Sequence, residues 1–225
     1  MGQAIGQVLS FGVGVALSPL PIVAVVLMLA TPRGRGNGPA FLLGWVVGLA
    51  VVGAVVLLVA SGASASDDGA PATWVGWLKL VLGLAALALA AKQFRDRPRG
   101  DAAPVLPKWM QAIDHFTPGR SVAIAFALSA VNPKNLLLTV GAAAAIAQTG
   151  IPAGEQAIAL AVFVVIATFG VGAPVVLYFA MGDRSEKLLG ELRDWMARNN
   201  GALMAVVFAV IGAKLIGDGI SGLTA

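Results

Sequence analysis

The tetrapeptide Asn132-Pro133-Lys134-Asn135 contains the side chains best suited to bind a ligand. It lies in the middle of an apolar run from about residue 121 to residue 148. As a helix, this run would be about 42 Å long at ~1.5 Å per residue, enough to cross a bilayer with tilt. Lys134 would then lie near the centre of the hydrocarbon, where a charged side chain costs at least ~2.5–3.5 kcal/mol. We therefore expect its ammonium group to face protein or water rather than lipid.

The same tetrapeptide has the features of a helix start. Asn is a favoured N-cap residue, and Pro is favoured at the first helical position. A helix that ends near Val131 and restarts at Pro133 directs unpaired N–H groups and a positive dipole end into the membrane interior. Together with Lys134, these groups predict an anion site. The alternative is a proline kink whose freed carbonyl groups are bonded by Asn132 or Asn135. A kink requires Pro133 but not Lys134, which favours the anion site.

A second helix restart is predicted at Ser18-Pro19-Leu20-Pro21, near the middle of the apolar residues 4–30. Ser18 would be the N-cap residue and Pro19 the first helical residue. The two restarts are about half the chain apart, since 133 − 19 is 114. The candidate substrate-binding residues are therefore Ser18, Pro19, Pro21, Asn132, Pro133, Lys134 and Asn135.

The composition is that of a polytopic membrane protein, because 58% of the 225 residues are hydrophobic and 12% are charged. There are no cysteines, which excludes disulfides and thiolate metal sites. The single histidine, His115, cannot form a His-based metal site by itself. No nucleophile–base pair is recognisable, so we expect neither an enzyme nor a bound cofactor. The net charge of +4 does not predict nucleic-acid binding, because the basic residues gather in particular loops.

Basic residues alternate along the connections between apolar segments and predict the orientation. The first, third and fifth connections are basic, and the second and fourth are not. The positive-inside rule places the basic connections in the cytoplasm and both termini outside the plasma (inner) membrane. The six apolar segments are about 4–30, 39–61, 73–94, 120–148, 156–181 and 201–221.

The predicted fold is all-α, with six transmembrane helices arranged as two inverted three-helix repeats. Residues 1–95 form the first repeat, 96–119 a cytoplasmic connection with an amphipathic helix, and 120–225 the second repeat. Because three crossings reverse the direction of insertion, the two interrupted helices, the first and the fourth, approach the membrane centre from opposite faces. Amphipathic patterns at 105–116 and 185–198 predict helices that lie on the inner membrane surface or pack against the end of the bundle.

The chain resembles the LysE superfamily of exporters, with Ser-Pro-x-Pro in the first helix and Asn-Pro-Lys in the fourth. The sequences Lys108-Trp109-Met110, Thr117-Pro118-Gly119-Arg120 and Asn132-Pro133-Lys134-Asn135-Leu136 resemble its GAP branch, which includes sulfolipid- and glycopeptidolipid-addressing proteins. This resemblance implies export or flippase-like translocation of an anionic cell-envelope lipid, often alongside a larger transporter. A LysE-type exporter of amino acids or other small solutes is an alternative. So is a non-transporting partner of a lipid export or synthesis complex.

The remaining polar residues favour these alternatives unequally. Lys214 and Asp218 share a helix face and predict an ion pair near the membrane interface. No acidic residue lies clearly inside the hydrophobic core, which argues against a cation pathway. A lipid substrate predicts a lateral opening beside the broken helices, and a water-soluble substrate predicts a closed polar cavity. A partner protein predicts that Lys134 is fully occupied by protein groups. A homodimer would suit so small a bundle.

Overall fold

The computed structural model describes residues 1–64, 73–96, 113 and 115–224, and this part of the chain is α-helical without strands. Large hydrophobic side chains cover much of its surface. Leu58, Val165 and Phe169 are 72%, 71% and 75% exposed. Water-soluble proteins rarely expose apolar surface on this scale, so these side chains are suited to contact lipid. The protein is therefore a multi-pass membrane protein.

Three helices are long and apolar enough to span a membrane: α3 (Gly34–Ser64), α7 (Ala153–Met181) and α8 (Ser185–Thr224). Two further spans are broken in the middle. Helices α1 (Gly2–Ala16) and α2 (Pro19–Leu29) meet at a bend of 53°. The second pair, α5 (Pro118–Phe126) with η2 (Ala127–Val131) and α6 (Pro133–Ala147), has a bend of 62°.

These two bends confirm the interruptions expected in the first and fourth apolar segments. Counting each broken pair as one span gives up to five spans among the described residues. The segment expected at 73–94 forms α4 (Thr73–Arg95), so six crossings stay a prediction.

Proline causes both breaks. Pro19 and Pro133 each begin a new helix, where the missing N–H group removes a bond to the preceding turn. Before Pro133 the chain widens into the π-helical turn η2, and the Asn132 N–H group bonds the Ala127 carbonyl at 3.0 Å. A π turn of this kind often marks a functional site in a helix.

The unbroken helices pack against the broken spans in a reciprocal way. Helix α3, from the first half of the chain, lies against α5, η2 and α6 of the second half. Helix α7, from the second half, lies against α1 and α2 of the first. Glycine permits both approaches, because a Cβ atom at Gly44 would overlap the Val122 carbonyl and one at Gly170 would overlap the Ala16 carbonyl.

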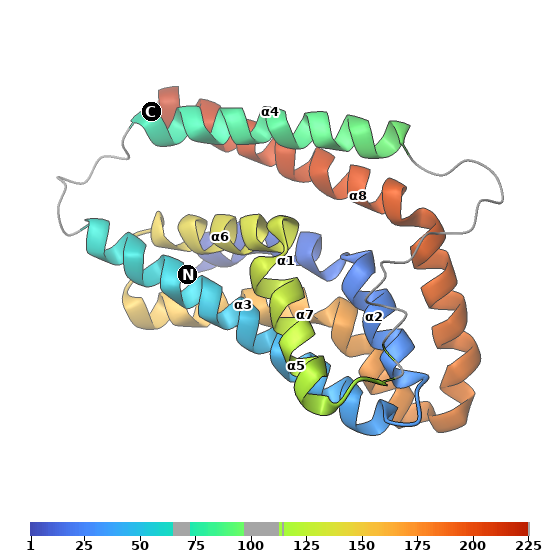
Figure 1. Cartoon of the computed structure of the whole chain (residues 1–225). Coiled ribbons are helices and arrows are strands. Elements are labelled where there is room, and N and C mark those ends of the chain that lie inside the picture. Colours follow the sequence, from blue (N-terminus) through green and yellow to red (C-terminus); the bar gives the residue numbers. More distant parts are fainter. Residues whose placement is uncertain (65–72, 97–112, 114, 225) are drawn as a thin grey trace.

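Helix α4 packs along the second half of α8 (Figure 1). The two helices are antiparallel and touch at two glycine pairs, Gly76 with Gly219 and Gly83 with Gly212. A Cβ atom at Gly212 would lie 2.9 Å from the Gly83 carbonyl oxygen. Small residues of this kind let membrane helices approach closely. The α4–α8 pair therefore forms a tight unit of its own beside the other helices.

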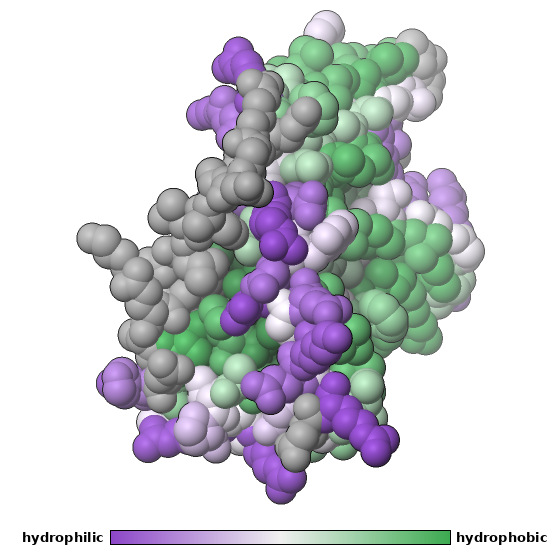
Figure 2. Space-filling view, turned by 90° about the vertical axis from the view of Figure 1, so that its right-hand side faces the viewer, coloured by the Kyte–Doolittle hydropathy of each residue, from purple (hydrophilic) through white to green (hydrophobic). Residues whose placement is uncertain are grey.

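The amphipathic residues 185–198 form the first part of α8, continuous with the last span. Leu189 and Met196 are only 4% and 6% exposed, so this helix packs on the end of the bundle, the second of the two positions expected. Its charged residues lie on the outer side, and Figure 2 shows hydrophilic residues gathered over the middle and lower part of this face. The other predicted amphipathic helix, 105–116, lies outside the described residues except for 113, 115 and 116.

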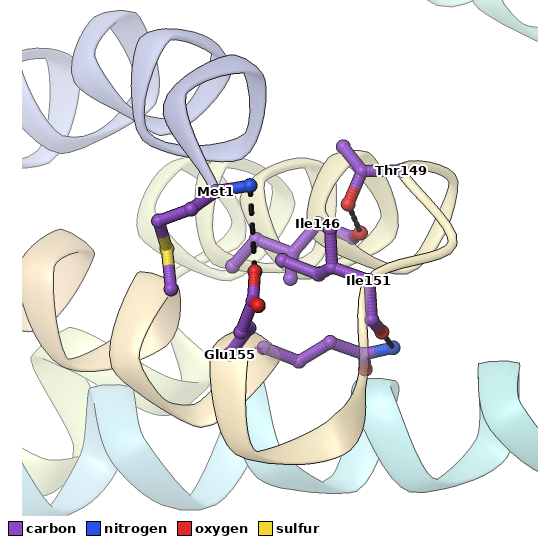
Figure 3. A network of polar contacts seen from close by, with 6 residues as sticks. Met1, Ile146, Thr149, Ile151 and Glu155 are labelled. Atoms are coloured by element: carbon purple, nitrogen blue, oxygen red, sulfur yellow. Dashed lines mark hydrogen bonds and ion pairs between the residues drawn. The ribbon is translucent and has the colours of Figure 1, made fainter.

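Polar contacts hold the end of α6 and the start of α7 near the amino terminus (Figure 3). The Met1 amino group lies 3.4 Å from Glu155 Oε2. Thr149 Oγ1 donates to the Ile146 carbonyl at 2.6 Å, which turns the chain after α6. Met1 and the α6–α7 connection thus lie at the same end of the bundle, called here the N-terminal side. The predicted topology requires this, while the side of the membrane on which that end lies stays a prediction.

Candidate functional site

The two broken spans meet at Ser18, Lys134 and Asn135. Ser18 Oγ donates a hydrogen bond to Asn135 Oδ1 at 2.8 Å, and Lys134 Nζ donates one to Ser18 Oγ at 2.8 Å. Ser18 and Asn135 are 3% and 1% exposed. Residues that are more than a hundred positions apart in sequence therefore form one polar cluster where the helices restart.

The two asparagines mainly satisfy backbone groups of the second break. Asn135 Nδ2 donates to the Leu128 carbonyl at 2.9 Å, a group that belongs to the loosened turn η2. Asn132 Oδ1 accepts a hydrogen bond from the Lys134 backbone N–H at 3.1 Å, as expected for an N-cap. The structural role expected in the kink alternative is thus present at Asn135, and it coexists with Lys134.

Ser18 differs from the expectation for an N-cap side chain. It occupies the N-cap position of α2, but its side chain makes no capping hydrogen bond. Pro21 at the third helical position has no N–H group to donate to a cap, and the Ser18 oxygen instead accepts from Lys134 Nζ. Ser18 therefore joins the two breaks instead of capping its own helix.

The prolines limit the number of backbone donors at both helix starts. Proline has no N–H group, so among the first three residues of α2 only Leu20 can donate, since Pro19 and Pro21 cannot. Pro19 and Pro21 are both buried and shape the turn. In α6, Pro133 cannot donate, and the Lys134 N–H group is already bonded by Asn132. The unpaired N–H groups expected at the two helix starts are thus few, and the charge of Lys134 must provide most of any anion binding.

No carboxylate among the described residues lies within 4.0 Å of Lys134 Nζ. The side chain is half-buried and lines a cavity of about 250 Å³ between α6, α1 and the α4–α8 pair. Most of the lining is hydrocarbon, and the polar residues are Gln7, Lys134, Gln148 and Asp218. The apolar lining includes Phe11, Leu82, Leu89, Leu137, Phe208 and Ile211.

The expected ion pair between Lys214 and Asp218 is confirmed, with 2.7 Å between Lys214 Nζ and Asp218 Oδ2. Lys214 Nζ also lies 5.2 Å from the centre of the Phe11 ring, close enough for a cation–π contact. Because Asp218 is paired with Lys214, the lysine at position 134 supplies the unbalanced charge. The three charged groups beside the cavity carry a net charge of +1.

A second hollow, of about 500 Å³, lies at the opposite end of the bundle between α2, α7 and α8. Its lining is more polar and includes Thr31, Tyr178, Glu186 and Arg193. The Arg193 guanidinium is held by Asp194 at 2.8 Å. The two hollows thus lie towards opposite ends of the helices.

Sequence reasoning found the polar cluster but missed the cavity. Phe11 and the α4 residues Leu82 and Leu89 are apolar side chains in apolar helices, and nothing in their spacing marks them. Only the packing of the helices shows that α4 pairs with α8 and leaves a space beside α6.

The family model described as "Sap, sulfolipid-1-addressing protein" matches residues 8–221 of this chain. The match includes both helix breaks, all seven candidate residues and most of the cavity. No curated protein matches. No solved structure matches either.

Proposed function

The chain belongs to the sulfolipid-1-addressing protein family, and we propose that it moves an anionic cell-envelope lipid across the membrane. The head group, a sulfate, phosphate or carboxylate, binds Lys134 where the two broken spans meet. Ser18 orients the ammonium group, and Asn135 holds Ser18 in place. The resemblance to the LysE superfamily, whose exporters use similar motifs, supports the same proposal.

One observation carries this proposal: an ammonium group with a neutral partner lies at an apolar cavity beside the two broken spans. Keeping such a charge in the hydrocarbon is costly when it is not offset. An anionic head group would offset it through a charge-assisted hydrogen bond, which is stronger than a neutral one.

The apolar lining favours a lipid over a water-soluble solute. A LysE-type exporter of amino acids would need a cavity with polar walls for the rest of its substrate, and the lining here is mainly hydrocarbon. A non-transporting partner role would leave Lys134 saturated by protein groups. Instead its three N–H donors have one side-chain acceptor among the described residues, Ser18 Oγ.

The arrangement of the two halves suits alternating access. We propose that the reciprocal packing of α3 and α7 reflects an inverted repeat and that the polar hollow between α2, α7 and α8 is the exit on one membrane face. Both termini then lie outside the cytoplasm. We further propose that the protein is not an enzyme, that it acts as a homodimer and that it works beside a larger envelope-lipid transporter.

Reconstitution into liposomes tests the proposal. The probe is a sulfated glycolipid with a fluorescent group on its chain, and a membrane-impermeant reductant measures how fast it changes leaflets. We expect Lys134→Met, which keeps the side-chain length but removes the charge, to slow translocation at least about tenfold.

Lys187→Met is the matched control, because the Lys187 side chain is 89% exposed at the far end of the bundle. The Lys187→Met protein should translocate the probe at the wild-type rate. Neither substitution should change the translocation rate of zwitterionic phosphatidylcholine. Unchanged translocation in correctly inserted Lys134→Met protein would refute the anion site.

A further inference from the structure

We propose that the cavity beside Lys134 is a binding site for one hydrocarbon chain, which enters sideways from the bilayer between α4 and α6. The inference rests on the proposed function, because the chain belongs to the lipid whose head group binds Lys134. It adds a second subsite, with its own residues and its own entrance.

The walls of the cavity have the shape of a groove along α6. Leu137, Gly141 and Ala144 recur at three- and four-residue steps and therefore share one face of that helix. On α4, Leu82, Ala86 and Leu89 form the opposite wall. Ala144 on α6 and Ala86 on α4 leave width for a chain, whereas Gly141 makes room for the Phe11 ring, 2.9 Å from where its Cβ atom would lie.

The groove has an open side towards lipid. Leu137 is 56% exposed, Leu89 44% and Leu82 38%, although all three line the cavity. Helix α4 packs mainly against α8, whereas α6 packs against α1, α3 and α7. The two helices are therefore not sealed against one another, and a lipid chain can reach the cavity without crossing a polar surface.

The size of the cavity selects a single chain. Its volume of about 250 Å³ is smaller than a pocket for a whole drug-sized ligand, which is ~300–1,000 Å³. From Lys134 to Gln148, α6 rises about 21 Å at ~1.5 Å per residue, more than the ~15 Å of half a hydrocarbon core. The cavity thus encloses part of one chain, which extends from Lys134 along the groove towards the N-terminal side.

Charge complementarity identifies the occupant as part of an anionic lipid rather than a neutral one. The groups beside the cavity carry a net charge of +1, and the unbalanced charge is at the mid-membrane end of the groove. Leaving the bilayer for an apolar groove gives a chain little hydrophobic gain, since both surroundings are hydrocarbon. The head group at Lys134 must therefore hold the chain in place.

Single cysteines can test this directly, because the natural chain has none. Ala144→Cys places a fluorescent bimane in the groove. The matched control is Ala157→Cys on α7, an exposed alanine at a similar depth from the same end of the bundle. In nanodiscs of phosphatidylcholine, the probe is 12-doxyl-stearate, a single-chain carboxylate lipid that quenches bimane on contact. We expect saturable quenching at Ala144 and linear, weaker quenching at Ala157. Adding Lys134→Met should raise the half-saturating probe concentration at Ala144 at least about tenfold.

Two results overturn parts of the account separately. Identical linear quenching at both positions overturns the chain site, and the translocation assay then still decides the proposed function. If quenching at Ala144 is saturable but Lys134→Met leaves the half-saturating probe concentration unchanged, the groove is supported and the head-group site is refuted. A third pair of variants checks the function of the groove: Ala144→Trp should block translocation and Ala157→Trp should not. If Ala144→Trp lowers the thermal stability, Ala144→Leu replaces it, and wild-type translocation by the stable variant contradicts the proposal.

Discussion

Both helix breaks consist of a bend followed by a helix that begins with proline, but the polar groups at the two breaks differ. At the first, Ser18 and two prolines bend the chain by 53°, and no side chain caps the new helix. At the second, a π turn, an asparagine cap and a second asparagine accompany a bend of 62°. The second break satisfies its own backbone groups and also provides the charge. The first provides a hydroxyl group that positions this charge.

Under the proposed function, this division of roles explains why one cation is enough. Two lysines at symmetric positions would repel one another in the hydrocarbon. A lysine opposite a serine instead has a neutral hydrogen-bond acceptor, and its charge stays available for a ligand. The functional asymmetry is therefore the difference between Ser18 at one break and Lys134 at the other.

The largest effect on stability is expected at Asn135, which joins the two breaks. Asn135→Leu removes the hydrogen bonds to Ser18 Oγ and to the Leu128 carbonyl, so the buried Ser18 hydroxyl loses its acceptor and the Leu128 carbonyl loses its side-chain donor. We expect a loss of about 2–3 kcal/mol in the free energy of unfolding. Unfolding in increasing SDS at constant detergent measures this.

Asn199→Leu provides the control for Asn135, because its hydrogen bond to the Trp195 carbonyl is exposed. We expect a change of about 0.5 kcal/mol or less. Similar losses for the two variants would show that Asn135 does not hold the breaks together.

The next largest effect concerns the first break alone. A Cβ atom at Gly170 would overlap the carbonyl oxygen of Ala16, the last residue of α1. Gly170→Ala should therefore shift the end of α1 and cost about 1–2 kcal/mol, despite the better helix propensity of alanine. The melting temperature and the affinity for an anionic head group should both fall.

Gly172 is the matched control two residues further along α7. A Cβ atom there lies in ordinary contact, 3.7 Å from Thr168 Cγ2 and 3.8 Å from Leu42 Cδ1. Gly172→Ala should be neutral or stabilise the protein by up to about 1 kcal/mol. The two substitutions should thus change stability in opposite directions. If Gly172→Ala destabilises the protein and Gly170→Ala does not, the packing described at α1 is wrong.

The smallest effect separates the two helix starts. Asn132→Ala removes the bond from the Lys134 N–H group and should cost about 1 kcal/mol. Asn132→Ser keeps a capping oxygen and should lose less than half of this. At the first break, including in Ser18→Gly, we expect no such dependence on a capping oxygen, because the Ser18 side chain does not cap α2. Equal melting temperatures for Asn132→Ala and Asn132→Ser would mean that the cap contributes little.

The sequence predicts both breaks because their causes are local. Proline at the first helical position and a preceding Ser or Asn are enough to expect a restart in an apolar run. The resemblance to sulfolipid-addressing proteins is confirmed by the match over residues 8–221, and the link to the LysE superfamily stays a prediction. The spacing predicts the amphipathic helix at 185–198, but it does not separate the buried Leu189 and Met196 from Leu188 and Trp195, which are 43% and 49% exposed.

Other features depend on long-range packing and could not be predicted. Ser18 was expected to cap its own helix, and the hydroxyl instead bonds Asn135 and Lys134, which no local rule contains. The shortage of backbone donors at α2 could have been noticed, because Pro19 and Pro21 are visible in the sequence. The groove between α4 and α6 arises because the glycine pairs draw α4 towards α8, away from α6.

Native mass spectrometry of lipid retention tests the central claim most directly. Hexadecyl sulfate and hexadecanol have the same chain and differ in the charged group, so their ratio reports the anion site by itself. Wild-type protein and Lys187→Met should retain hexadecyl sulfate at least about tenfold better than hexadecanol, and Lys134→Met should retain the two equally. If Lys134→Met keeps the wild-type preference for the sulfate, Lys134 is not the group that binds the anion.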